Sequence, residues 1–122
     1  GTDLSIITYG MGVHWALDFI NNNDQISIDL LDLRTLIPLD IESIKKTVIK
    51  TGKVLILHED ANIGGFGADI SSFIAQELFE HLDAPIYRVS SLDTPIPFAA
   101  DLEKKYLANH RLKDEILSLY AY

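Results

Sequence analysis

Short apolar runs alternate along the chain with segments whose apolar residues recur every three or four positions. The run Val54–Leu57 is continuously apolar, which is typical of a strand covered on both faces. The other runs are bounded by Gly, Pro or polar turn residues. We therefore predict four strands, over Leu4–Gly10, Ile26–Leu33, Lys53–Glu59 and Ile86–Ser91.

Helical periodicity fills the intervals between these runs. Asp40 follows Pro38 and is suited to cap a helix that should stop near Gly52. Strands that alternate with helices imply βαβ units, a mainly parallel sheet and a three-layer α/β/α sandwich, formed by one domain over residues 1–122. The predicted helices cover Gly12–Asn21, Asp40 to about Gly52, Gly67–Leu82 and about Leu112–Leu119.

The first predicted helix has two apolar stripes. We expect Val13, Ala16, Leu17 and Ile20 to cover the sheet. The second stripe consists of Met11, Trp15 and Phe19, which are four residues apart. It predicts an interface, unless a long loop or the residues near Tyr120–Tyr122 fold over it. A rigid segment with two prolines, Asp93–Phe98, also suggests a packed contact, although a plain surface loop is the alternative. The candidate interface residues are Met11, Trp15, Phe19, Ile96 and Phe98.

A carboxylate interrupts the apolar stripe of the third helix. On a helical wheel Glu77 falls among Phe66, Ile70 and Phe73. An unpaired buried carboxylate would cost several kcal/mol. We therefore expect Glu77 either to be hydrogen-bonded, with Arg88 as the best partner, or to lie exposed past the sheet edge.

Composition and charge exclude several kinds of site and partner. The chain has no Cys, which excludes disulfides, thiolate zinc sites and a Cys nucleophile, and fits a reducing compartment such as the cytoplasm or the mitochondrial matrix. The net charge of −8 argues against nucleic acid as a partner. No apolar run is long enough to cross a bilayer. The chain opens on Gly rather than Met, which we interpret as the boundary of a domain cut from a longer protein.

The glycine-rich segment Ile63–Gly67 lies between a strand and a helix, where phosphate-binding loops occur. The third Gly of the dinucleotide fingerprint is replaced by Ile70, and no Gly-Lys-Ser/Thr follows. A tight turn is therefore the favoured interpretation. The four His residues have no shared ligand spacing, so we predict no metal site.

Polar residues gather at the carboxyl ends of the predicted strands, the edge where open α/β sheets bind ligands. Helix capping or contact with another domain is the alternative, and it is favoured because no recognisable motif is present. The candidate crevice residues are Tyr9, His14, His58, Glu59, Gly64 and Gly65.

Five stretches together, in order along nearly the whole chain, resemble the transketolase C-terminal domain. More closely, they are similar to the last domain of the beta part of the decarboxylating component of 2-oxoacid dehydrogenase complexes. Val48–Lys53 followed by His58-Glu59 is more similar to the branched-chain (2-oxoisovalerate) enzymes than to the pyruvate enzymes. One departure is Glu59–Ile63, where the family more often has Glu-Ala-Pro. The matching stretches are Asp32–Asp40, Thr51–Lys53, Gly64–Gly67, Asp83–Val89 and Asp93–Pro97.

The resemblance implies a parent enzyme that decarboxylates a 2-oxoacid on thiamine diphosphate and transfers the acyl group to a lipoyl group. It places thiamine diphosphate and magnesium between two other domains. The family's Gly-Asp-Gly motif is absent here, so no catalytic or cofactor-binding residue is expected in this chain. The expected role is assembly: contact with the parent's other domains, homodimerisation, and docking of the core component's basic subunit-binding domain. The rival hypothesis is a stand-alone small-ligand or nucleotide-binding module.

The family also implies a strand order. Ile26–Leu33 and Lys53–Glu59 should flank Leu4–Gly10, with Ile86–Ser91 outermost and all four strands parallel. An antiparallel strand precedes this region in the family, so the outer edge of Ile26–Leu33 should be unpaired or borrowed by a neighbouring chain. The crevice should then lie between the ends of Leu4–Gly10 and Lys53–Glu59.

Overall fold

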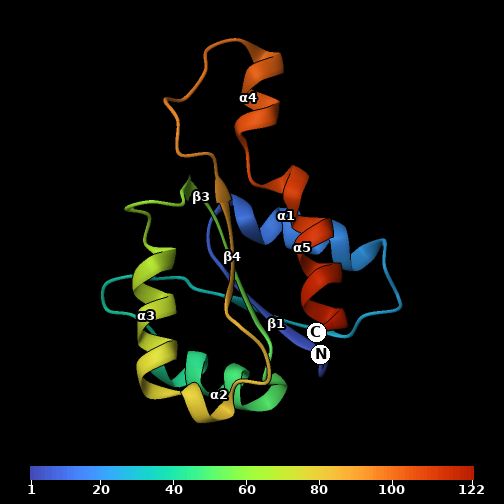
Figure 1. Cartoon of the computed structure of the whole chain (residues 1–122), viewed down its shortest axis with the longest axis vertical. Coiled ribbons are helices and arrows are strands. Elements are labelled where there is room, and N and C mark those ends of the chain that lie inside the picture. The colour runs from blue at the N-terminus through green and yellow to red at the C-terminus, as the bar shows by residue number, and fades with distance from the viewer.

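A computed structural model describes all residues from 1 to 122. Four parallel strands form one sheet in the order β2-β1-β3-β4, which confirms the expected order and direction. Three of them, β1, β3 and β4, are labelled in Figure 1. The outer edge of β2 has no partner strand in this chain. The strands are β1 (Leu4–Thr8), β2 (Ile28–Asp32), β3 (Val54–Ala61) and β4 (Tyr87–Ser91).

Helices cover both faces of the sheet, as the three-layer prediction requires. One core cluster joins the sheet to α1 and α5, through residues such as Ala16 and Ile116. A second cluster joins the other face to α2 and α3, through residues such as Ile44 and Ile70. The helices are α1 (Met11–Asn21), α2 (Ile41–Thr51), α3 (Gly67–Glu77), α4 (Ala100–Tyr106) and α5 (Asn109–Ala121), with a 3₁₀ turn, η1, at Phe79–His81.

The two central strands are buried because helices lie on either side of them. Every residue of β1 is buried, and so are the first five residues of β3. Successive side chains alternate between the faces, so Ile6 packs with α1 and α5, whereas Ile7 packs with α2 and α3. The continuous apolar pattern of these strands therefore reflects burial on both faces.

Two predicted helix boundaries need correction, and one helix was missed. α3 ends at Glu77 and is followed by η1, rather than running to Leu82. α5 begins at Asn109, three residues before the predicted start at Leu112. α4 lacks an apolar stripe, because only Tyr106 of its residues is buried. Without a buried face, α4 has no hydrophobic periodicity for a sequence pattern to reveal.

Glu77 is exposed at the end of α3, which is the second of the two expected outcomes. Its carboxylate therefore stays hydrated and needs no buried partner. Arg88 instead donates a hydrogen bond to the carbonyl oxygen of Asn62 at 3.3 Å.

The face of α1 that meets the sheet differs from the expected stripe. Gly12 and Ala16 are buried, whereas Leu17 is 40% exposed. Trp15 and Phe19 flank this inward face, half-buried and packed on the core cluster that α5 completes. The two predicted stripes of α1 therefore border a single inward face, which Gly12 and Ala16 form. No helix is both long and apolar enough to cross a bilayer.

Candidate functional site

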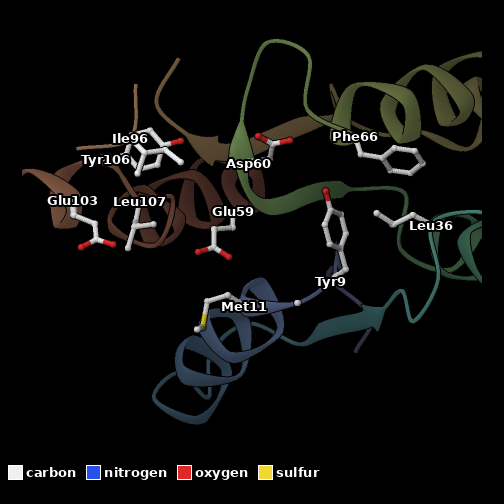
Figure 2. A pocket seen from close by; sticks show the side chains of 11 residues that line it. Tyr9, Met11, Leu36, Glu59, Asp60, Phe66, Ile96, Glu103, Tyr106 and Leu107 are labelled. Atoms are coloured by element: carbon white, nitrogen blue, oxygen red, sulfur yellow. The ribbon is translucent and has the colours of Figure 1, made fainter. Parts of the chain in front are cut away.

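A cavity of about 520 Å³ opens at the carboxyl edge of the sheet. Its walls come from the ends of β1 and β3, the start of α1, the loop after β2, the residue before α3, and the segment around α4 (Figure 2). Segments far apart in the sequence therefore meet at one edge of the sheet. The lining residues are Tyr9, Gly10, Met11, Leu36, Glu59, Asp60, Phe66, Ile96, Glu103, Tyr106 and Leu107.

Local backbone geometry brings Tyr9 and Met11 to the mouth of this cavity. β1 ends at Thr8, and Gly10 turns the chain into α1 with a φ of 58°. A side chain is disfavoured at such a φ, whereas glycine adopts it freely. The turn at Gly10 therefore brings both the aromatic ring of Tyr9 and the thioether of Met11 to the cavity.

The charged residues of the cavity are all acidic: Glu59, Asp60 and Glu103. No Lys, Arg or His is among the lining residues. The only hydrogen bond to any of the three carboxylates is local, from the backbone nitrogen of Ala61 to Oδ1 of Asp60 at 2.7 Å. The cavity therefore presents negative charge that no residue of this chain neutralises.

An aromatic stack lies beneath the cavity. The rings of Tyr9 and His58 are 6.1 Å apart between centroids and inclined by 16°. Burial, and secondarily the charge of Asp60, raises the pKa of the Tyr9 hydroxyl. Burial lowers the pKa of His58 below its ordinary value, so its imidazole is neutral near pH 7.

His58 is fully buried, and neither ring nitrogen has a hydrogen-bond partner. Gly65 in the loop before α3 and Gly67, the first residue of α3, pack directly on the ring. A Cβ on Gly65 would lie 2.8 Å from Cε1 of His58, and a Cβ on Gly67 would overlap Nε2. The glycines therefore allow close packing on an imidazole, which agrees with the tight-turn interpretation of this segment.

The structure brings together only some of the candidate crevice residues. Tyr9 and Glu59 line the cavity, and His58 with Gly65 lies beneath it. Gly64 is exposed on the loop, and His14 lies in a separate hollow with Asp32 and Arg34.

Among the candidate interface residues, Met11 and Ile96 line the cavity. Phe98 is fully exposed. Trp15 and Phe19 border a different hollow, against Asn109, Leu112 and Lys113 of α5. The start of α5, rather than the residues near Tyr120–Tyr122, therefore lies beside this stripe.

Sequence reasoning missed several residues of the cavity. Asp60 was detectable, because it follows Glu59 at the end of a buried strand. Glu103 carried no signal, because α4 was not predicted. The other missed residues are Gly10, Leu36, Phe66, Tyr106 and Leu107.

The cavity does not fit a diphosphate or a metal ion. Three carboxylates and no cation would repel a diphosphate, and the His58 ring fills the space below the glycine loop. No group of three or more His, Asp or Glu side chains has an arrangement that could hold a metal ion.

Arg88 on β4 and Arg111 on α5 both donate hydrogen bonds to backbone oxygens of the fold. Arg111 donates to the carbonyl oxygens of Ser90 at 2.5 Å and Tyr106 at 3.4 Å, which ties α5 to β4 and to the end of α4. Arg88 donates to Asn62, as described above. These contacts use the guanidinium groups to satisfy backbone oxygens.

The transketolase C-terminal domain family matches residues 1–111. The pyruvate dehydrogenase E1 component subunit beta of Rickettsia felis is 43% identical over 106 residues, covering 85% of this chain and 32% of that protein. The mitochondrial 2-oxoisovalerate dehydrogenase subunit beta of Dictyostelium discoideum is 42% identical over 113 residues, covering 90% and 30%. The 2-oxoisovalerate dehydrogenase subunit beta of Bacillus subtilis is 40% identical over 112 residues, covering 89% and 34%.

The chain thus spans about a third of the length of these relatives. Relatives of both the pyruvate and the branched-chain type match, so the preference for the branched-chain type stays a prediction. A solved structure, a split gene transketolase described as an inactive beta4 tetramer, shares the fold with a TM-score of 0.79. It is 23% identical, and the match covers 99% of this chain and 39% of that one. Sequence and fold together show that the chain belongs to the transketolase C-terminal domain family.

Proposed function

We propose that this chain is the C-terminal assembly domain of a thiamine diphosphate-dependent 2-oxoacid dehydrogenase. Large apolar side chains exposed at the carboxyl edge of the sheet carry the proposal. They lie on the loops that follow β2, β3 and β4, and their exposed fractions range from 67% to 106%. The residues are Ile37, Ile63, Ile96 and Phe98.

Single exposed apolar residues are normal on a protein surface. Here they occur on three loops at the same edge, beside a cavity with mainly apolar walls. Exposed apolar surface that gathers in this way marks an interaction site. The edge is therefore suited to burial against other domains or subunits of a parent enzyme.

The proposed partners are the parent's other domains, a second copy of the beta part, and the basic subunit-binding domain of the acyltransferase core component. The net charge of −8 favours the basic partner. The interface candidates remain Met11, Trp15, Phe19, Ile96 and Phe98. The half-burial of Trp15 and Phe19 in this chain makes them the weaker candidates.

The proposed parent reaction is oxidative decarboxylation of a branched-chain 2-oxoacid, with acyl transfer to a lipoyl group. The stretch Val48–Lys53 followed by His58-Glu59 supports the branched-chain type. Thiamine diphosphate and magnesium would be held by other domains of the parent. We propose that the isolated domain is inactive, and that the parent works in the cytoplasm, or in the mitochondrial matrix of a eukaryote.

A chimera tests the assembly role. The matching stretch of the Bacillus subtilis 2-oxoisovalerate dehydrogenase subunit beta is replaced by this chain, and the association state is measured by sedimentation velocity. The chimera should form pairs of beta subunits, whereas a subunit lacking the stretch should not. Equal association of the truncated subunit would contradict the proposal.

The cavity favours a second candidate function, a small-ligand binding module, because its volume and apolar walls suit a small molecule. Titration calorimetry of the 122-residue chain with thiamine diphosphate and adenine nucleotides separates the two. The assembly role predicts no binding heat. Binding in the micromolar range would favour the ligand module.

A further inference from the structure

The charge and the walls of the carboxyl-edge cavity point to the same class of side chain. Glu59 and Asp60 follow the buried part of β3, and Glu103 approaches from α4 (Figure 2). None of these three residues forms a salt bridge within the chain. A cation that enters the cavity would therefore meet three available carboxylates and no competing positive charge.

The walls suit the stem of a long cationic side chain. Met11, Leu36 and Leu107 supply aliphatic surface. Tyr9 and Tyr106 supply aromatic rings, which lie on opposite sides of the cavity in Figure 2. Lys and Arg place their methylene stems on apolar surface while the charged head reaches polar groups. Guanidinium groups also stack on aromatic faces.

We propose that this cavity receives an Arg or Lys side chain from a segment of another polypeptide, with apolar residues on either side of that side chain in the segment. The combined negative charge of Glu59, Asp60 and Glu103 attracts the cation, and the flanking apolar residues cover Ile96 and Phe98. The inference rests on the proposed assembly function and names the chemistry of the partner at this edge.

A polypeptide fits better than a free small cation because of what surrounds the cavity. Ile96 is 67% exposed although it lines the cavity, and Phe98, two residues further on, is fully exposed. A small molecule inside the cavity would leave these side chains in water. A peptide segment buries both the cation and the apolar rim in one contact.

The probe is the capped tripeptide acetyl-Phe-Arg-Leu-amide, titrated into the ¹⁵N-labelled 122-residue chain and followed by NMR. The matched control peptide has citrulline in place of arginine, which keeps the shape and removes the charge. The amide signals of Tyr9, Glu59, Asp60 and Glu103 should shift with the arginine peptide. Binding should be about fivefold weaker for the citrulline peptide, and weaker also at high salt.

Protein variants make the test specific. The double variant Glu59→Gln, Glu103→Gln should lose the preference for arginine over citrulline, and both side chains are exposed, so the fold should be kept. The control variant Glu42→Gln, on α2, should keep the preference. Equal binding of the two peptides, no binding of either, or a preference that survives the double variant would overturn the proposal.

Free arginine amide forms the last arm of the experiment. If it bound as tightly as the tripeptide, the site would be a small-cation site and the polypeptide partner would be wrong. The chimera experiment fails or succeeds independently of this one, because it measures association of subunits without any added peptide. The two proposals can therefore be overturned separately.

Discussion

At the scale of single residues, the most constrained position is the His58 ring beneath the glycine loop. The ring is fully buried, stacks on Tyr9 and packs against Gly65 and Gly67. Sequence predicted the tight turn, because the dinucleotide fingerprint fails at Ile70. It did not predict what the glycines contact, because that contact joins β3 to the loop before α3 and depends on tertiary packing.

The substitution Gly67→Ala should destabilise the chain, although alanine is normally the better helix residue. The new Cβ would overlap Nε2 of His58 and lie 3.3 Å from Cγ2 of Ile56. Such overpacking costs about 1 to 3 kcal/mol, measured as the free energy of unfolding in urea. In a His58→Ala background the added penalty should largely disappear, because the space is free. An equal penalty in both backgrounds would show that His58 does not set the constraint.

Asp29 predicts a pH dependence of stability. Partial burial raises its pKa, but hydrogen bonds from Lys50 and Thr47, together with the N-terminal amine, outweigh burial and bring the pKa to about 2 from 3.8. Since the folded pKa is the lower one, the stabilisation is present above pH 4 and is lost as the pH falls towards 2. After allowance for the exposure of Asp29, the loss should be about 1 kcal/mol.

Urea unfolding between pH 5 and pH 2 measures this loss directly. Asp29→Asn should flatten the dependence, because the amide does not titrate. Asp24→Asn is the matched control, since Asp24 is exposed and accepts no hydrogen bond within the structure. If both variants changed the slope equally, the hydrogen bonds to Asp29 would not be the cause.

At the scale of elements, the capping signals predicted the ends of α2 correctly, whereas the apolar pattern did not predict which face of α1 meets the sheet. The cap at Asp40 and the end of α2 at Gly52 were read correctly from adjacent residues. α1 presents Gly12 and Ala16 to the sheet because small residues let a helix approach closely, and a Cβ on Gly12 would overlap Oγ1 of Thr8. A search for large apolar residues therefore selects the flanks of this helix and misses its contact face.

Asp40→Ala should weaken α2, because it removes the side chain that caps the helix. The carboxylate of Asp40 accepts hydrogen bonds from the backbone nitrogen of Ser43 at 3.1 Å and from its hydroxyl at 2.7 Å. Removal of the carboxylate leaves that helical nitrogen without its cap. The free energy of unfolding measures the loss, and Asp40→Asn should retain most of the stability, because an amide oxygen also caps. A loss as large in Asp40→Asn would point to charge rather than capping.

At the scale of the whole molecule, strand order, direction and layering followed from alternating strand and helix patterns together with the family resemblance. The sequence also predicted a crevice at the ends of β1 and β3, where the cavity lies, but not most of its lining, because that lining comes from segments that only the fold brings together. Ile96 and Phe98 were singled out from local sequence alone, as large apolar residues beside prolines. Their position at the same edge as Ile37 and Ile63 becomes visible only when the loops are placed on the sheet.

Two phenylalanines distinguish a core position from the proposed interface. Phe19 is half-buried and packs on the core cluster, so Phe19→Ser should lower the free energy of unfolding by about 2 kcal/mol. Phe98 is fully exposed, so Phe98→Ser should change it by less than about 0.5 kcal/mol. In the beta-subunit chimera, Phe98→Ser should instead weaken association about tenfold, because an apolar anchor at the edge is lost. Urea unfolding and sedimentation give the two readouts, and a Phe98→Ser chimera that associates normally would remove Phe98 from the interface.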